Sequence, residues 1–152
     1  KKIFNHFMLL VKTRIGPSKI NGIGLFANQF IPKGILIWKF KPGFDLEITK
    51  DKLTKLSQHT RDQFLHYCYL DKKPDKYVLS FDDARFMNHS ETPTIEDGDP
   101  YGYDGDIAVR DIYEGEELTY DYKKEDADYA RKFGIINLLN DFEKQNLPPK
   151  KN

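Results

Sequence analysis

Short hydrophobic or alternating stretches recur along most of the chain and predict β-strands. Turns rich in proline and glycine separate them. The strongest β signal is ILIWKF (35–40), which follows the turn IPKG (31–34). The other predicted strands cover residues 8–14, 25–30, 77–81, 107–112 and 117–122. Short strands at irregular spacing argue against a parallel βαβ sheet and favour a mostly β, α+β domain.

A helical pattern interrupts the predicted strands between residues 45 and 76. Thr49 is expected to cap a helix over 50–56, and Thr60 to cap a second helix over 61–70. The pattern therefore predicts a helical insert within the β domain.

The last part of the chain is charged and carries a second helical pattern. Tyr129, Phe133 and Ile136 recur at i, i+4 and i+7, the spacing of an apolar stripe on a helix. We predict a C-terminal helix over 124–145 and a flexible tail over 146–152.

The composition limits the classes of function. One domain is expected for 152 residues, and a chain of this length can bury a self-sufficient core. The 24 basic residues balance the 24 acidic ones, so the net charge attracts neither nucleic acid nor a membrane. Cys68 is the only cysteine, which excludes a disulfide and a zinc site with several thiolates. We expect no metal and no direct contact with nucleic acid or membrane.

The chain begins with seven residues before its first methionine, Met8. We expect residues 1–7 to be a leader or an addition, and the domain to occupy 8–123. A single cysteine fits a reducing, intracellular compartment. The nucleus of a host cell is the alternative location, if the protein is a secreted effector.

Two stretches between the strands carry candidate binding chemistry. NGIGLFA (21–27) holds a G-x-G turn, where backbone can approach a ligand closely, but the third glycine of a dinucleotide fingerprint is missing. The acidic stretch 91–106 departs from a calcium loop, because Ala108 stands where the last ligand, a glutamate, belongs. A solvated loop and a negative rim for a cationic substrate remain open for it.

The tyrosines of ELTYDY (117–122) are the candidates for catalysis. If the whole stretch is a strand, Tyr120 and Tyr122 point to the same face. Two core aromatics are one interpretation, and a pair of hydroxyls that orient an amine is the other. His59 and His66 are expected to be ordinary helix residues, and Cys68 a small buried hydrophobe.

Three motifs occur in a fixed order: GIGLFA (22–27), RFMNHS (85–90) and GEELTYDY (115–122). Together they resemble the SET-domain protein-lysine methyltransferases over roughly residues 10 to 123. The resemblance implies a fold of small curled sheets with a knot-like crossing, which brings the second and third motifs together. It also implies S-adenosylmethionine as the cofactor.

The resemblance assigns roles to individual residues. The cofactor would lie against Gly22, Ile23, Gly24, Asn88 and His89, largely through the backbone of His89. Tyr122 would be the catalytic tyrosine, with its hydroxyl near the transferring methyl group.

The substrate channel is the second implied feature. Tyr120 would add a hydroxyl to it and favour monomethylation. Tyr129 or Phe133 would line it in place of the cysteine-rich zinc segment that many members append; the open alternative is that both rings only pack on the sheet. A further departure is Thr94, which replaces the last residue of the C-x-P-N sequence found after NHS in many members.

Three functions follow from these observations. The first is methyl transfer to the ε-amine of a lysine in a basic protein such as a histone, by a monomer or a homodimer. The second is a regulatory module that keeps the fold and binds the cofactor with little turnover. The third is methylation of small amines.

Overall fold

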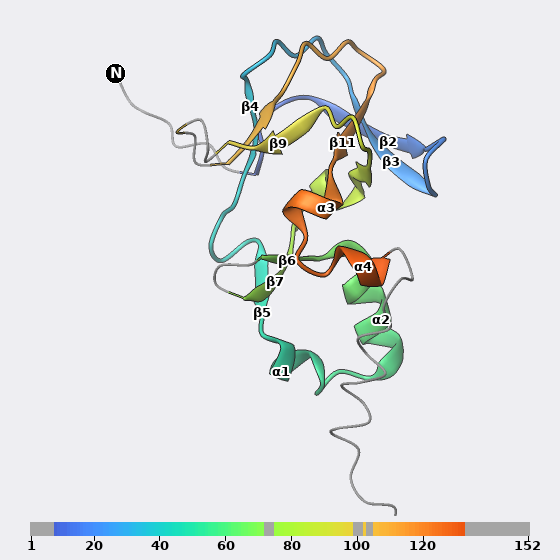
Figure 1. Cartoon of the computed structure of the whole chain (residues 1–152), viewed down its shortest axis with the longest axis vertical. Coiled ribbons are helices and arrows are strands. Elements are labelled where there is room, and N and C mark those ends of the chain that lie inside the picture. The colour runs from blue at the N-terminus through green and yellow to red at the C-terminus, as the bar shows by residue number, and fades with distance from the viewer. Residues whose placement is uncertain (1–7, 72–74, 99–101, 103–104, 133–152) are drawn as a thin grey trace, which may run out of the picture.

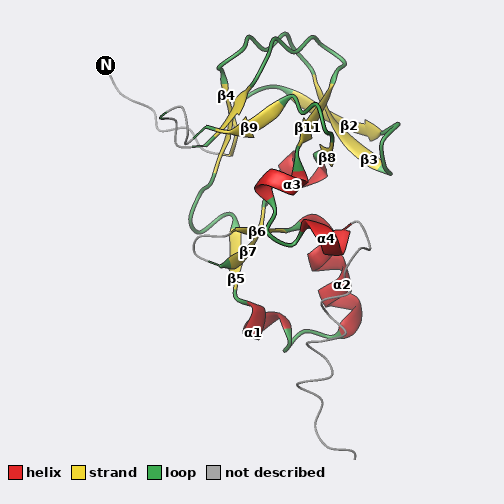
Figure 2. Ribbon diagram, in the orientation of Figure 1, coloured by secondary structure: helices red, strands yellow, loops and turns green. Residues whose placement is uncertain are grey.

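The chain folds into two units stacked along its long axis (Figure 1). The computed structural model describes residues 8–71, 75–98, 102 and 105–132. The upper unit consists mainly of strands, and the lower unit of short helices and a small sheet (Figure 2). The last two helices, α3 and α4, lie where the two units meet.

The upper unit is built from two four-stranded sheets. The first has the order β1-β4-β10-β9, with bounds Met8–Leu9, Leu36–Lys39, Asp106–Ala108 and Ile95–Asp97. The second has the order β2-β3-β11-β8, with bounds Thr13–Pro17, Ile23–Ala27, Glu117–Tyr120 and Asn88–His89. The 3-10 helix η1 (Asp83–Phe86) leads into β8.

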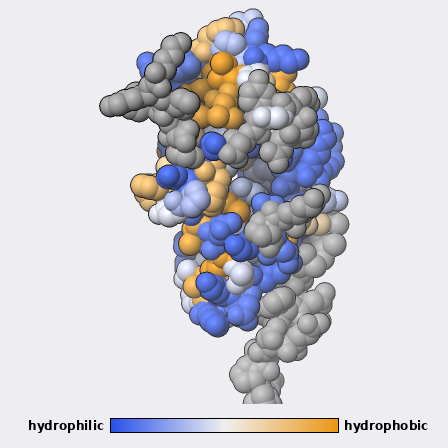
Figure 3. All heavy atoms as spheres, turned by 90° about the vertical axis from the view of Figure 1, so that its left-hand side faces the viewer, coloured by the Kyte–Doolittle hydropathy of each residue, from blue (hydrophilic) through white to orange (hydrophobic). Residues whose placement is uncertain are grey.

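The core of the upper unit is made by the inward faces of these strands. Its fully buried members include Leu25, Ile37 and Leu118, which are 0% exposed. Each such side chain contributes about 1.5–3 kcal/mol through burial. On the face seen in Figure 3, hydrophobic residues show in the upper unit and again below it among hydrophilic ones, and hydrophilic residues cover most of the lower tip.

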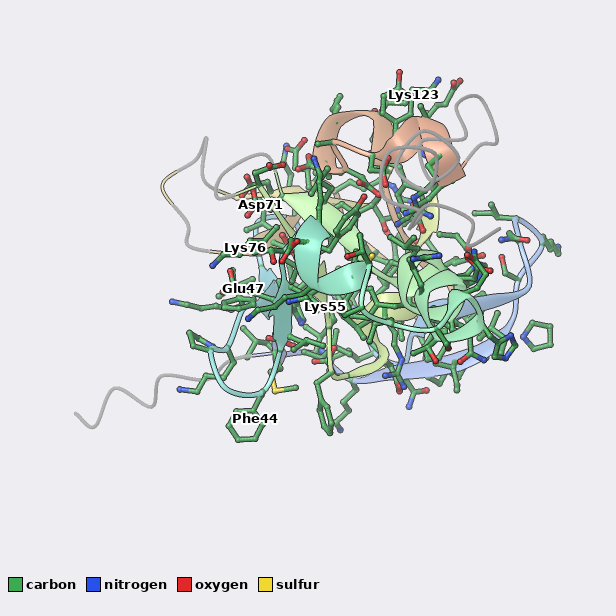
Figure 4. All side chains as sticks on the ribbon, turned by 90° about the horizontal axis from the view of Figure 1, so that it is seen from below. Phe44, Glu47, Lys55, Asp71, Lys76 and Lys123 are labelled. Atoms are coloured by element: carbon green, nitrogen blue, oxygen red, sulfur yellow. The ribbon has the colours of Figure 1, made fainter. Side chains whose placement is uncertain are left out.

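The lower unit corresponds to the predicted insert. A three-stranded antiparallel sheet, in the order β5-β7-β6, packs with the helices α1 and α2 around a second core. The bounds are Leu46–Ile48 (β5), Lys50–Leu53 (α1), Gln58–Tyr67 (α2), Tyr69–Asp71 (β6) and Lys76–Leu79 (β7). Glu47 and Lys76 pair on the outer side of this sheet, at 3.4 Å, and Phe44 projects away from it (Figure 4).

The helices of the insert differ in detail from the prediction. α2 starts at Gln58, because the Ser57 hydroxyl accepts a hydrogen bond from the Thr60 backbone at 3.3 Å and caps the helix three residues early. It ends before Cys68, whose backbone is extended, so the predicted last turn is the start of β6 instead.

The strand predicted over 117–122 ends at Tyr120. Asp121 caps the short helix α3 (Tyr122–Glu125) by accepting a hydrogen bond from the Lys123 backbone at 3.0 Å. Tyr122 is therefore the first residue of a helix, and the expectation that it continues the face of Tyr120 along one strand is wrong.

The predicted C-terminal helix is interrupted near its start. Asp126 has an extended backbone, and its carboxylate accepts hydrogen bonds from the backbone of Leu70 and Asp128, both at 2.9 Å. A second short helix, α4 (Tyr129–Lys132), follows. The remainder of the predicted helix and the predicted tail lie outside the described residues.

β11 lies between β3 on one side and β8 on the other, and the segment that follows β8 also bonds to β11. β8 pairs with β11 in parallel, with Asn88 opposite Thr119 and His89 opposite Tyr120. Further along, Thr94 and Thr119 exchange hydrogen bonds: the Thr94 backbone donates at 3.2 Å, and its hydroxyl accepts at 2.8 Å. This crossing brings the second motif, RFMNHS (85–90), beside the third, GEELTYDY (115–122), as predicted. Within the described ranges, no helix is long and apolar enough to cross a membrane.

Candidate active site

Two cavities lie at the junction of the upper and lower units and share part of their lining. The larger, of about 920 Å³, runs along the glycine turn, β8 and α2. The smaller, of about 320 Å³, runs between β4, β10 and β11. The lining that both cavities share consists of His66, Tyr67, Arg85, Met87, Tyr122 and Lys132.

The glycine turn forms one end of the larger cavity. Gly22 has a φ of +48°, and a Cβ placed there would have no atom within 4 Å, so the turn leaves open space beside its backbone. The Asn88 side chain fixes this turn, since its Nδ2 donates to the backbone oxygens of Asn21 at 3.1 Å and Ile23 at 3.2 Å. Asn88 therefore shapes the cavity mainly by holding the turn.

Glu117 ties the turn to the third motif. Its carboxylate accepts hydrogen bonds from Asn88 Nδ2 at 2.9 Å and from the Ser18 hydroxyl at 2.8 Å. Gly24 lies against this carboxylate: a Cβ there would stand 2.3 Å from Glu117 Oε1. Gly24 does not line the larger cavity, so the expectation that it contacts the cofactor is replaced by a packing role.

His89 lies between the second and third motifs. Its Nδ1 accepts a hydrogen bond from the Tyr122 backbone at 3.1 Å, so Nδ1 carries no proton in this arrangement. The 3.8 Å approach of Asp121 to the same atom is therefore not an ion pair. The interaction sets the direction in which the chain leaves β11, and with it the position of the Tyr122 ring.

Tyr122 lines both cavities. Its hydroxyl donates a hydrogen bond to the Met87 backbone oxygen at 2.5 Å. Burial raises the pKa of Tyr122 to about 12, with smaller contributions from Asp126 and Glu117. The phenol is therefore protonated at neutral pH.

Tyr120 lines the smaller cavity together with aromatic rings and carboxylates. Burial, and after it the charge of the nearby Asp106 carboxylate, raises the pKa of Tyr120 well above its ordinary value, and both residues line this cavity. Trp38 and Tyr69 supply ring surface to the same cavity. The acidic residues in the lining are Asp71, Asp97, Asp106, Glu125 and Asp126. A cavity lined by aromatic rings and acidic groups suits the side chain of a lysine.

Lys132 is the residue of α4 that reaches the site. Its ammonium lies 4.5 Å from the centre of the Tyr122 ring and 3.0 Å from Asp126 Oδ2. Tyr129 lines neither of these two cavities, so its predicted place in the substrate channel stays a prediction. α4 is a single turn, and its residues Arg131 and Lys132 line the larger cavity. Phe133 lies outside the described residues.

The structure therefore brings together most of the residues that the motifs single out. Gly22, Ile23, Asn88, His89 and Tyr122 line the larger cavity, and Tyr120 and Tyr122 line the smaller one. The described part of the chain contains no group of three or more histidine, cysteine or acidic side chains that could hold a metal ion.

Three contributors to the site were not predicted from the sequence. Met87 acts through its backbone oxygen, which no side-chain pattern reveals. Lys132 reaches the site only because Asp126 interrupts the helix before it. Asp106 belongs to the acidic stretch that was left open as a solvated loop or a negative rim, and only its contact with Tyr120 singles it out.

Comparison with known proteins decides the family. A model of the SET domain matches residues 22–123, which is more than half of the chain. The chain belongs to the SET domain family. The match includes all three motifs and both tyrosines of this SET domain.

Relatives of this SET domain include far longer proteins. It is 33% identical to the histone-lysine N-methyltransferase trithorax of Drosophila virilis over 114 residues, which are 70% of this chain and 3% of that protein. It is 31% identical to the histone-lysine N-methyltransferase trr of Drosophila melanogaster over 123 residues, 76% of this chain and 5% of that protein. The chain thus spans a small part of these relatives.

Solved structures share the fold of this SET domain. An autoinhibited apo Polycomb Repressive Complex 2 of Chaetomium thermophilum matches with a TM-score of 0.60 and 20% identity, over 91% of this chain and 17% of that chain. The same complex bound to GSK126 matches with a TM-score of 0.59 and 20% identity, over 82% and 17% of the two chains. These likenesses confirm the predicted mostly β, α+β SET fold.

Proposed function

We propose that this SET domain transfers a methyl group from S-adenosylmethionine to the ε-amine of a lysine in a basic protein. The observation that carries the proposal is the position of Tyr122, which lines both cavities. A cofactor in the larger cavity and a lysine in the smaller one would meet at this residue. The names of the relatives, histone-lysine N-methyltransferases, support the same reaction and make a histone the first candidate substrate.

The larger cavity has the size and the chemistry for this cofactor. Its volume lies within the usual range for ligands of that size. Gly22 offers backbone with open space beside it, and Asn88 and His89, next to this turn, would hold the cofactor together with it. Arg131 and Lys132 border the cavity, which suits the carboxylate of an amino acid moiety. The bound cofactor would supply a methyl group activated by a sulfonium.

The smaller cavity would prepare the lysine for the reaction. The attacking amine has to be neutral, although the ordinary pKa of lysine is about 10.4. Rings such as Trp38 and Tyr69 exclude water, and desolvation lowers the pKa of an amine. Tyr122 and the Met87 backbone oxygen would align the amine for attack, and positioning alone contributes a large part of a rate enhancement.

We propose that the product is mainly monomethyl-lysine. The Tyr120 hydroxyl occupies space in the smaller cavity and can accept one N–H of the amine. An amine held in this way has less room for further methyl groups.

The partner proposed here is a cationic protein segment. Asp71, Asp97 and Glu125 line the smaller cavity and would attract lysine-rich sequence. We expect no direct binding of nucleic acid, since the net charge is zero, and a monomeric or homodimeric protein.

Transfer of radiolabelled methyl groups to core histones, cell lysate and small amines tests the proposal. Labelled protein bands are the expected result. Binding of the cofactor in calorimetry without any labelled product would favour a regulatory module instead. Label in small amines alone would favour a small-amine methyltransferase.

Tyr122→Phe is the variant that tests the site itself. The change removes the hydroxyl that donates to the Met87 backbone oxygen while the ring remains. We expect labelling to fall by about 100-fold or more, with cofactor binding retained. Labelling at the wild-type rate would remove Tyr122 from the reaction.

A further inference from the structure

The two cavities differ in the charge of their linings. The larger one is lined by the cations Arg85, Arg131 and Lys132, together with the carboxylate of Asp62. The smaller one shares Arg85 and Lys132 but carries the acidic residues named above. A cationic lining attracts a negative group, so the larger cavity suits a ligand with an anionic end and the smaller one suits a cation.

Contacts with the protein distinguish the three cations. Arg131 donates from Nε to Asp128 at 2.6 Å, and Arg85 donates to the Phe81 backbone oxygen at 3.3 Å. Lys132 contacts Tyr122, the residue on which the proposed reaction depends: its ammonium lies 4.5 Å from the centre of the Tyr122 ring. A ligand bound to Lys132 would therefore be placed beside this tyrosine.

The position of Lys132 is fixed by a buried carboxylate. Asp126 Oδ2 lies 3.0 Å from the ammonium, and Asp126 Oδ1 accepts from the Leu70 and Asp128 backbones, both at 2.9 Å. The side chains of Lys132 and Asp126 are 14% and 2% exposed. Because solvent reaches them so little, salt screens their charges less than it screens a surface pair.

The ammonium of Lys132 retains a donor for a ligand. It has three hydrogens, of which Asp126 Oδ2 takes one and the Tyr122 ring faces another. The third is left for an acceptor in the cavity, and a carboxylate there would form a charge-assisted hydrogen bond. In the proposed cofactor, a short chain joins the carboxylate to the sulfur. A carboxylate held by Lys132 would therefore also position the sulfur relative to Tyr122.

We propose that Lys132 binds the carboxylate of the cofactor's amino acid moiety and so selects a nucleoside that carries this group. The inference rests on the proposed function and deepens it, because it assigns the contact to one of the cations that border the larger cavity. Lys132 lies beyond residues 22–123, which the model of the SET domain matches, so the family motifs assign it no role.

Calorimetric binding of two ligands to the full chain tests the proposal. S-adenosylhomocysteine carries the amino acid moiety, and 5′-methylthioadenosine has the same nucleoside and sulfur without it. The wild type should bind S-adenosylhomocysteine more tightly. In Lys132→Met, the affinity for S-adenosylhomocysteine should fall by about 10- to 100-fold, as expected for loss of a hydrogen bond between charged groups. The affinity for 5′-methylthioadenosine should change by less than about threefold.

Further variants separate the charge of Lys132 from its packing. Lys132→Arg keeps a cation whose planar fork suits a carboxylate, so it should recover most of the affinity for S-adenosylhomocysteine. Lys132→Gln can still donate to Asp126 and should show the same selective loss as Lys132→Met, including in the case that Lys132→Met does not fold.

Lys124→Met on α3 is the matched control. Lys124 is 66% exposed and lines neither of the two cavities, so both affinities should stay within about twofold of the wild type.

The possible outcomes separate the two proposals. An equal loss for both ligands in the neutral variants of Lys132 would mean a structural role and would overturn the inference, while the methyl transfer stands. Unchanged binding of S-adenosylhomocysteine in these variants, or equal affinity of the wild type for the two ligands, would overturn it as well. A wild type that binds neither ligand would overturn the cofactor of the proposed function, and this inference with it.

Discussion

Tyr120 and Tyr122 are two residues apart, yet their side chains have different surroundings. The Tyr122 hydroxyl donates to the Met87 backbone oxygen, whereas Tyr120 lies near the Asp106 carboxylate. The difference arises because the strand ends between them and Asp121 starts a helix. A continued strand would have placed both rings on one face.

Tyr120→Phe should change the products. Loss of the hydroxyl leaves room for a bulkier amine, so we expect more dimethyl- and trimethyl-lysine at completion. Mass spectrometry of the histone products measures this distribution. The rate is a poor guide here, because the change also removes the contact with Asp106. An unchanged product distribution would contradict the assignment.

Gly24→Ala should disturb the site indirectly, through the Glu117 carboxylate that holds the glycine turn. The new methyl group would displace the Glu117 carboxylate, which holds both Ser18 and Asn88. We expect a loss of about 1–3 kcal/mol in the free energy of unfolding, typical of overpacking, and weaker cofactor binding in calorimetry.

Gly16→Ala on the neighbouring strand is the matched control for this substitution. Its Cβ would meet only side-chain atoms, the nearest being an Arg14 guanidinium nitrogen at 3.4 Å, and we expect less than about 0.5 kcal/mol. Equal losses in the two variants would show that the Glu117 contact is unimportant.

At the scale of elements, the sequence predicted where several strands lie better than it predicted where helices end. Hydrophobic patterning located the strands around 35–40, 77–81 and 107–112, because their buried faces decide the pattern. The end of α2 and the break at Asp126 depend on contacts with residues far along the chain, such as the Leu70 backbone. Local propensity contains no information about such contacts.

The segment after α3 is fastened to the lower unit by buried polar contacts. The Asp128 carboxylate accepts hydrogen bonds from the Tyr77 hydroxyl at 2.7 Å and from Arg131 Nε at 2.6 Å. Arg131 also donates to the Leu65 backbone oxygen at 2.9 Å, and the Ala127 backbone donates to Leu70 at 2.9 Å. These contacts fix the position of the helix that presents Lys132 to the site.

Asp128→Asn should release this segment. The substitution replaces a charged acceptor shared by Tyr77 and Arg131 with a neutral amide, so we expect a loss of about 2 kcal/mol, measured by denaturant unfolding.

A surface pair provides the control. Asp51→Asn removes an exposed pair with Lys55, whose side chains are 83% and 73% exposed, and should change stability by less than about 0.5 kcal/mol. A similar small effect of Asp128→Asn would mean that its network contributes little to folding.

At the scale of the whole molecule, the two units have separate cores that the same C-terminal segment touches. Cys68 is fully buried in the lower core. Burial raises the pKa of its thiol to about 12, so it is protonated and unreactive in the folded state. It is the only thiol in the chain and can report on opening of the lower unit.

Thiol labelling with a maleimide should therefore be slow in the native protein and fast in denaturant. In Asp128→Asn we expect faster labelling at neutral pH, because the segment that covers the lower unit opens more often. Mass spectrometry of the single adduct follows the rate. Rapid labelling of the native wild type would contradict the burial of Cys68.

Only the site residues that belong to a recognisable motif could be predicted from the sequence. The three motifs singled out Gly22, Asn88 and Tyr122, which the fold gathers around one cavity. Asp106 depends on a bulge, and Lys132 on an interrupted helix. These are properties of long-range packing, which a single sequence does not express as a pattern.

The strand β11 is an inner strand of its sheet, and it is contributed late in the described chain. During synthesis on a ribosome, its neighbours β3 and β8 emerge first and lack the strand that pairs with both of them. Such non-local pairing slows folding. The second and third motifs can therefore come together only after β11 has been synthesised.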